Sequence, residues 1–235
     1  DCLKAHQGSL FLPVLVDESK YHLLYVDLNY SSVNGLVTWH IFKINWLTFD
    51  SKINKVTNNK IILEDTINDS FISVCKHANG RDWWLIFNKY NTNTFYKILF
   101  SPSGMELIDV QNLGPIVIDG VSQAVFSPKG NYFALLEGIS NREGLFIYLY
   151  TFDRCTGKLG YIDWANYGAK GFMGISFSPN EKYLYWSEGY NLYQMDLRSP
   201  DPVNYLEKVD SIIDLTPPWG SSYFQHQIGP DGKIY

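Results

Sequence analysis

The densest group of side chains able to bind a ligand or do chemistry lies in residues 77–82. His77, Asn79, Arg81 and Asp82 place an imidazole, an amide, a guanidinium and a carboxylate close together along the chain. Such a cluster could contribute to a ligand site, because one loop then offers both donors and acceptors. The Asn79-Gly80 pair, however, is a type I′ turn signal, and the same side chains would then hydrogen bond locally. The sequence favours the turn and keeps His77 and Asp82 as candidate binding residues.

Gln123 and His226 lie in short runs that we expect to be inner strands of a repeated sheet. Polar side chains there could face a central channel and bind a small ligand or water, although a residue satisfied within the protein is commoner. A catalytic site would need a nucleophile and a base that converge. The five histidines lie in different registers, and no G-x-S-x-G, H-E-x-x-H, P-loop or EF-hand motif is present. We assign no catalytic residue.

Metal ligands and cofactor motifs are equally scarce. Cys2, Cys75 and Cys155 form no C-x-x-C pair and have no histidine at zinc-ligand spacing. The acidic residues show no spacing that forces two carboxylates together, as a glycosidase or a calcium site requires. The sequence therefore predicts no metal site and no cofactor.

Aromatic residues in two expected loops are the remaining candidates for binding. Trp164 and Tyr167 lie in the first loop and Trp219 in the second, each shortly before an expected inner strand. We expect both loops on one rim of the fold, where aromatic side chains anchor protein or glycan partners. Alternatively these rings fold back over the sheet edges, and the sequence does not separate the two.

A repeat of constant length positions all these residues. The strings Phe-Ser-Pro at 126–128 and 177–179, and Gly-Pro-Asp-Gly at 229–232, each stand between two apolar runs. The turn positions Gly80, Gly130, Glu181 and Gly232 are 50, 51 and 51 residues apart. A constant period of this length indicates a supersecondary repeat.

Each repeat holds four short runs rich in Val, Ile, Tyr, Phe and Trp, separated by turn residues. In the third repeat they are Val121–Phe126, Tyr132–Glu137, Leu145–Thr151 and Leu159–Ile162. Four antiparallel strands per repeat are typical of a β-propeller blade, so we predict an all-β propeller with WD40-like blades. We expect one propeller region over 1–235, with blades at 9–63, 71–110, 121–163, 172–208 and 223–235. The fifth of these stops inside its second strand, so we expect the propeller to be incomplete here and further C-terminal modules of the same polypeptide to follow.

Composition limits the classes of partner. The 235 residues carry 19 Lys+Arg against 24 Asp+Glu, a formal net charge of −5, and 16% aromatic residues. Scattered basic residues give no electrostatic footprint for nucleic acid or anionic membrane. No apolar run approaches the roughly 18 residues of a membrane span.

Several strings resemble a known family. They are Lys76–Trp84, Asn88–Tyr96, the two Phe-Ser-Pro strings, Leu192–Leu197 and Gln227–Tyr235. This set resembles the surface and secreted proteins of gliding bacteria that carry a gliding-motility-associated or type IX secretion sorting domain. The resemblance covers about Tyr21 to Tyr235. It implies a WD-like propeller ectodomain, export across two membranes and display or release outside the cell, and it implies no catalytic residues.

These observations predict a non-catalytic exported propeller that acts as a protein or glycan interaction or scaffold module at the bacterial cell surface, with a link to gliding motility or type IX secretion. The alternative is a carbohydrate-active hydrolase or lyase with its site in the propeller channel, near His226 and Gln123. A third interpretation is a purely structural spacer. An enzyme would show two or more titratable side chains within hydrogen-bond reach of one point.

Overall fold

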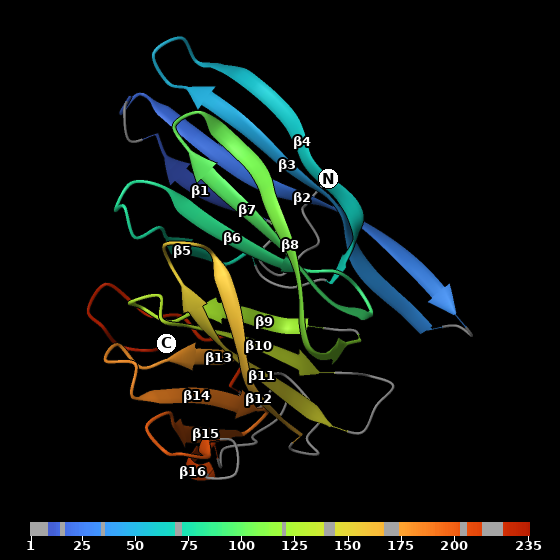
Figure 1. Ribbon diagram of the computed structural model, residues 1–235, viewed down its shortest axis with the longest axis vertical. Helices are drawn as coiled ribbons and strands as arrows, with labels where there is room; N and C mark the ends of the chain where they lie inside the picture. The colour runs from blue at the N-terminus through green and yellow to red at the C-terminus, as the bar shows by residue number, and fades with distance from the viewer. Residues whose placement is uncertain are drawn as a thin grey trace. The chain divides into compact units, whose positions relative to one another are not determined.

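The computed structural model describes residues 9–14, 17–33, 36–68, 72–118, 121–138, 144–166, 174–202, 206–212 and 223–235. The regular elements of these residues are all β-strands, and they form four antiparallel sheets of four strands each (Figure 1). In every sheet the strands follow one another in chain order. The prediction of an all-β chain built from four-stranded repeats is confirmed.

The strand bounds follow the repeat. The first sheet contains β1 (Ser9–Pro13), β2 (Lys20–Val33), β3 (Leu36–Asp50) and β4 (Lys55–Asn68). The second contains β5 (Val74–Lys76), β6 (Trp83–Asn88), β7 (Thr92–Ser101) and β8 (Gly104–Val117). The third contains β9 (Val121–Phe126), β10 (Tyr132–Gly138), β11 (Leu145–Asp153) and β12 (Lys158–Asn166). The fourth contains β13 (Ile175–Phe177), β14 (Tyr183–Glu188), β15 (Asn191–Asp196) and β16 (Leu206–Ser211).

The chain divides into two compact units. Unit 1 comprises Asp1–Gly120 with Arg154–Lys158, and unit 2 comprises Val121–Asp153 with Leu159–Tyr235. Unit 1 therefore holds the first and second sheets. Unit 2 holds the third and fourth sheets and the C-terminal segment 223–235, where Ile228 and Ile234 form an isolated bridge.

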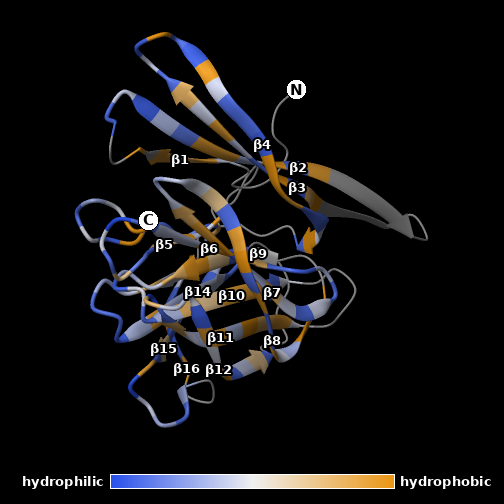
Figure 2. Ribbon diagram, turned by 45° about the horizontal axis from the view of Figure 1, so that its top comes forward, coloured by the Kyte–Doolittle hydropathy of each residue, from blue (hydrophilic) through white to orange (hydrophobic). Residues whose placement is uncertain are grey.

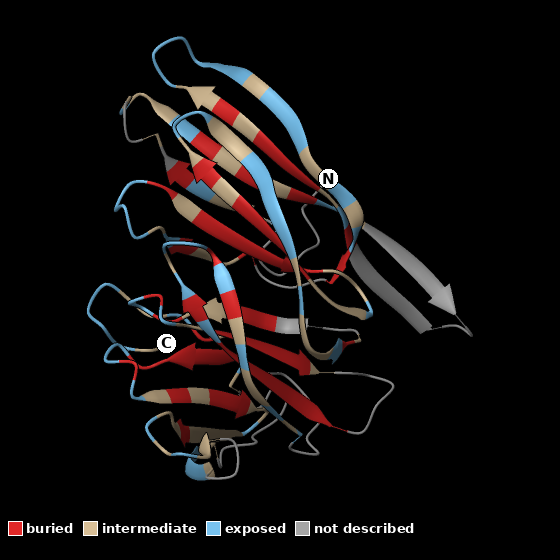
Figure 3. Cartoon of the chain, in the orientation of Figure 1, coloured by how far each residue is buried: buried red, intermediate tan, exposed pale blue. Residues whose placement is uncertain are grey.

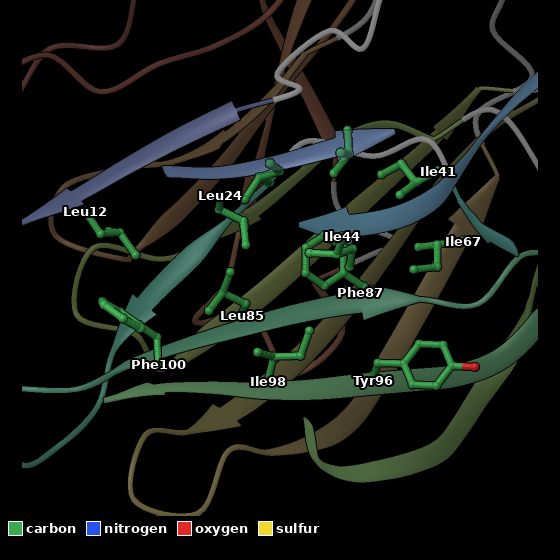
Figure 4. Packing of buried hydrophobic residues seen from close by; sticks show 12 residues of the cluster. Leu12, Leu24, Ile41, Ile44, Ile67, Leu85, Phe87, Tyr96, Ile98 and Phe100 are labelled. Carbon is green, nitrogen blue, oxygen red and sulfur yellow. The ribbon is translucent and has the colours of Figure 1, made fainter. Parts of the chain in front are cut away.

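The core of unit 1 lies between its two sheets. Alternate residues of β2, β3 and β4 meet alternate residues of β6 and β7, because successive side chains of a strand point to opposite faces. Figure 4 shows this cluster, which includes Leu24, Ile44, Leu85, Phe87 and Ile98. Full burial of each such side chain contributes on the order of 1.5–3 kcal/mol to stability.

The core of unit 2 has the same plan. Leu136 of β10 and Ile147 and Leu149 of β11 pack with Phe177, Trp186 and other residues of the fourth sheet. In β11 the six residues from Leu145 to Tyr150 are all buried, and this strand appears apolar in Figure 2 and buried in Figure 3. A strand buried on both faces is a continuous apolar run rather than an alternating one.

The Ser-Pro strings recur in the sequence because each serine has the same structural role in its repeat. Ser127 Oγ accepts the amide protons of Asn131 and Tyr132, at 3.1 and 3.0 Å, and Ser178 Oγ accepts that of Tyr183 at 3.0 Å. Each hydroxyl thus closes the turn into the next strand. Glu181 takes the place of the turn glycine with a φ of 60°, and its carboxylate accepts from Lys129 N and Asn131 Nδ2, both at 2.6 Å.

The outer strands differ most from expectation. β4 extends to Asn68, and β12 extends to Asn166, four residues beyond the predicted Ile162. Trp164 therefore lies within an outer strand, and its prediction as part of a loop is wrong. The reason is that β12 continues its alternation through the loop-like residues Asp163 and Asn166, which remain at least partly accessible.

Candidate functional site

The segment 77–82 forms a self-contained turn. Asn79 Oδ1 accepts the amide protons of Arg81 and Asp82, at 2.9 and 3.0 Å, and Asn79 Nδ2 donates to Asp82 Oδ2 at 2.7 Å. His77 Nδ1 accepts from Asn79 N at 2.9 Å. The segment is a turn, as predicted, but the type I′ assignment is wrong. Gly80 N donates to His77 O at 2.9 Å, so Ala78 and Asn79 are the central residues, and only Gly80, with a φ of 72°, has a positive φ.

Asp82 is buried, and Arg81 covers it from the solvent side. Arg81 Nε and Nη2 donate to the two carboxylate oxygens at 2.8 and 3.2 Å. The hydrogen bond from Arg81 holds the pKa of Asp82 below its usual value. Both oxygens of this carboxylate are thus already occupied by the turn, which leaves little for a ligand.

His77 packs against a tryptophan. Its ring stacks on Trp84 with centroids 5.4 Å apart, and Trp84 Nε1 donates to Arg154 O at 2.9 Å within unit 1. Trp83, next in the chain, lies under the Lys76 ammonium at 5.4 Å from its ring centroid. The neighbouring tryptophans serve opposite faces of β6, as their adjacency predicts.

The buried side chain of Gln123 connects three segments of unit 2 by hydrogen bonds, which we call the Gln123 staple. Its Oε1 accepts from Ile175 N at 2.9 Å and from His226 N at 3.3 Å, and its Nε2 donates to His226 O at 2.8 Å. One side chain therefore joins β9, β13 and the segment 223–228. The structure brings Gln123 and His226 together, and the contact runs from the amide side chain of Gln123 to the backbone of His226. Gln123 lies in β9 as predicted, but His226 lies outside any strand, so its prediction as an inner-strand residue is wrong.

Ser187 makes a second staple beside the first. Its Oγ accepts from Gly174 N at 3.0 Å and donates to Phe224 O at 3.3 Å. Gly174 allows this close approach, because a Cβ there would collide with the Phe224 carbonyl oxygen and the His226 ring. The backbone of 224–226 is thus held mainly by side chains of β9 and β14.

His226 is buried, and its imidazole is uncharged near neutral pH. Burial lowers its pKa from 6.5 to about 4, and its Nδ1 has no hydrogen-bond partner among the described residues. Charging this ring would place an unpaired cation in a desolvated position. His226 therefore suits a neutral packing role.

Among the candidates that the structure describes, Trp164 is the one that is exposed, while His77 is partly buried. The Trp164 side chain is 43% exposed, and its ring stacks on Phe146 at 5.7 Å. Tyr167 and Trp219 lie outside the described residues, so the predicted aromatic rim is represented by Trp164 alone.

Two hydrogen-bonded networks of unit 1, around Asp65 and His22, were not predicted from the sequence. Asp65 accepts from Lys89 Nζ at 2.7 Å and from the Tyr96 hydroxyl. Burial alone would raise the pKa of Asp65, but these hydrogen bonds outweigh it and lower the pKa. His22 Nδ1 accepts from Trp46 Nε1 at 2.9 Å, and burial lowers the pKa of His22 to about 4. No local pattern signals either network, since the partners are 20 or more residues apart.

Other site types find no support in the part of the chain that the structure describes. Those residues contain no group of three or more His, Cys, Asp or Glu side chains able to hold a metal ion. Among them, no helix is long and apolar enough to cross a membrane.

Solved structures with similar folds place the chain in a structural class. A Pseudomonas aeruginosa periplasmic gluconolactonase, PpgL, aligns with a TM-score of 0.56 and 11% identity over 93% of this chain and 59% of its own. A Bacteroides uniformis protein assigned as a 6-phosphogluconolactonase gives a TM-score of 0.53 and 15% identity over 93% of this chain and 71% of its own. The Dos1 propeller gives a TM-score of 0.50 and 13% identity over 81% of this chain and 53% of its own.

These likenesses define the fold. The chain has a β-propeller fold of four-stranded blades, as its repeat predicts. It spans just over half the length of the Dos1 propeller. No protein-family model matches the sequence, and a search of curated proteins finds no match.

The Gln123 staple makes a direct prediction. Gln123→Ala removes both ends of the amide and leaves the buried His226 carbonyl and Ile175 amide unpaired, which costs roughly 2–5 kcal/mol of unfolding free energy. Urea unfolding followed by circular dichroism measures this loss. Gln123→Glu replaces the donor to the buried His226 carbonyl by a carboxylate oxygen, so at pH 7 it should destabilise the fold at least as much as alanine does. An alanine variant as stable as wild type would contradict the staple.

The two buried histidines predict a loss of stability in mild acid. At pH 7.5, above the ordinary histidine pKa of 6.5, they are mostly neutral in both the folded and the unfolded chain. As pH falls from 6.5 towards 4, each histidine becomes protonated in the unfolded chain but stays neutral in the folded chain, where its pKa is about 4. The unfolding free energy therefore drops by up to about 3 kcal/mol per histidine. Urea unfolding at pH 7.5, 5.5 and 4.5 tests this. His226→Asn should flatten the slope, and a slope equal to that of wild type would disprove the assignment for His226.

Proposed function

We propose that this chain is a non-catalytic β-propeller module of an exported bacterial protein, which binds a protein or glycan at the cell surface. One contrast carries the proposal. The polar candidates Asp82, Gln123 and His226 are engaged within the protein or buried, whereas Trp164 presents an accessible ring. Export, and the link to gliding motility or type IX secretion, rest on the sequence resemblance.

Trp164 is held in place before any partner arrives. Its ring stacks on Phe146 at 25°, and Phe146 stacks on Tyr148 with centroids 6.5 Å apart. The Tyr148 hydroxyl donates to the buried Glu137 carboxylate at 2.5 Å. A stacked row of rings anchored by a hydrogen bond fixes the tryptophan, so binding costs little side-chain entropy. Tryptophan is the residue most enriched among binding hot spots.

Trp164→Ala should therefore weaken partner binding about tenfold or more, because a stacked aromatic anchor contributes more than 1 kcal/mol. Titration calorimetry against cello-, chito- and xylo-oligosaccharides and a purified envelope polysaccharide gives the affinities for glycans. A pull-down with solubilised envelope proteins covers protein partners. Tyr190→Ala is the matched control, since Tyr190 is 46% exposed in the turn before β15. Equal losses in both variants, or none in Trp164→Ala, would contradict the proposal.

Lactone hydrolysis is the second candidate function. It is a specific case of the carbohydrate-active hydrolase that the sequence left as an alternative. The names of two structural neighbours favour it, a gluconolactonase and a 6-phosphogluconolactonase. We expect no hydrolysis of glucono-1,5-lactone or its 6-phosphate above the buffer rate, measured by proton release at pH 7. Activity that disappears in His226→Ala, in protein shown to be folded, would overturn the non-catalytic assignment.

A further inference from the structure

A second accessible aromatic ring lies near Trp164 on the strand β12. Tyr161 comes three residues earlier in this strand, and its side chain is 38% exposed. The Tyr161 ring meets the ring of Tyr150 edge to face, with centroids 5.9 Å apart, and the Trp164 ring stacks on Phe146. Each exposed ring on β12 is therefore supported by a buried ring on β11.

These two contacts place Tyr161 and Trp164 on one face of the third sheet. Phe146 and Tyr150 are separated by an even number of residues in β11, and alternate residues of a strand point to the same face. Tyr148 lies between them and stacks on Phe146, so the three rings form one row. Tyr161 and Trp164 lie over the two ends of this row, within unit 2.

The separation of the two exposed rings limits what they can bind together. Three residues along a strand span about 10 Å, at roughly 3.3 Å per residue. One pyranose covers one aromatic ring, so two rings at this separation match two sugars with a third sugar between them. A β-1,4-linked chain is extended and presents its sugars along one line, whereas an α-1,4-linked chain coils.

The chemistry between the rings suits a sugar better than a protein. Burial and the nearby Asp163 carboxylate raise the pKa of Tyr161, and Asp163 Oδ1 accepts from Trp164 N at 2.8 Å. Sugar hydroxyls donate to carboxylates in charge-assisted hydrogen bonds, whereas the core of a protein interface is depleted of charge. Aromatic faces are electron-rich, so they attract the C–H groups on the flat side of a pyranose.

We propose that Tyr161 and Trp164 form one platform for an extended β-1,4-linked glycan of at least three sugars, with Asp163 as an acceptor for its hydroxyl groups. This inference rests on the proposed binding at Trp164 and specifies its ligand class. Each ring stacks on one sugar of the same chain. The contacts with Tyr150 and Phe146 hold the rings before the glycan arrives, so little side-chain entropy is lost on binding.

Titration calorimetry of the full chain with the di- and hexasaccharides of the cello-, xylo- and chito- series tests the platform. In at least one series the hexasaccharide should bind about tenfold or more tighter than the disaccharide, because only the longer chain reaches both rings. Maltohexaose, which is α-1,4-linked, should gain no such advantage over maltose. Tyr161→Ala should reduce the affinity for the hexasaccharide to that for the disaccharide. Tyr161→Phe keeps the ring and should bind as the wild type does, and circular dichroism verifies that both variants fold.

The outcomes separate this inference from the proposed function. Equal affinities for di- and hexasaccharides in every series, or a Tyr161→Ala variant that binds as the wild type does, would overturn the platform. A protein partner that is lost in Trp164→Ala, with no oligosaccharide bound, would also overturn it but would leave the proposed function standing. Only if Trp164→Ala changes the binding of neither glycan nor protein do both fail.

Discussion

The need to cover both faces of a four-stranded sheet governs this molecule. In β6 the residues Trp84–Asn88 are all buried, and in β10 Phe133–Glu137 are as well, so these central strands are covered on both faces. Such a sheet is stable only where other parts of the protein pack on both of its faces. Each large apolar side chain left exposed loses on the order of 1.5–3 kcal/mol of stabilisation from burial. Sheet-on-sheet packing within unit 1 and within unit 2 follows directly.

Covering these faces also decides what the polar residues do. A backbone segment that packs on a sheet without joining its ladder must satisfy its amides and carbonyls in another way. In unit 2 the segment 223–228 does so through Gln123 and Ser187, whose side chains replace ladder hydrogen bonds. In unit 1 Asn79 does the same for the turn before β6. Gln123, which the sequence offers as a candidate for binding, thus satisfies buried backbone groups in the structure, and Asn79 satisfies the backbone of its own turn.

Burial also determines which strands could be predicted from the sequence. The inner and central strands were predictable, because the Ser127 and Ser178 turns recur at a fixed spacing and the runs between them are apolar. The extent of the outer strand β4 was not, because the first blade was predicted to end at residue 63 and β4 continues to Asn68. Only one face of such a strand touches the core, and its exposed residues show no clean alternation. Trp164 was misplaced for that reason. The partners of the staples, such as Gln123 and His226, are 103 residues apart, and no local pattern connects them. The turn of residues 77–82 was predictable, because Asn79-Gly80 determines it locally.

Catalysis at His226 and binding at Trp164 would make different demands on the surrounding residues. An efficient general base has a pKa near the working pH, whereas burial lowers that of His226 to about 4, which makes it a weak base at neutral pH. The nearby Ser187 hydroxyl already accepts from Gly174 N and donates to Phe224 O. A hydrolase built on this pair would have to release the hydrogen bond that holds Phe224 in order to act, at a cost of about 1–3 kcal/mol in each turnover. Binding at Trp164 requires no such release, since its ring is accessible and already fixed by Phe146. The proposed binding at Trp164 is thus compatible with the hydrogen bonds that hold residues 224–226 in place.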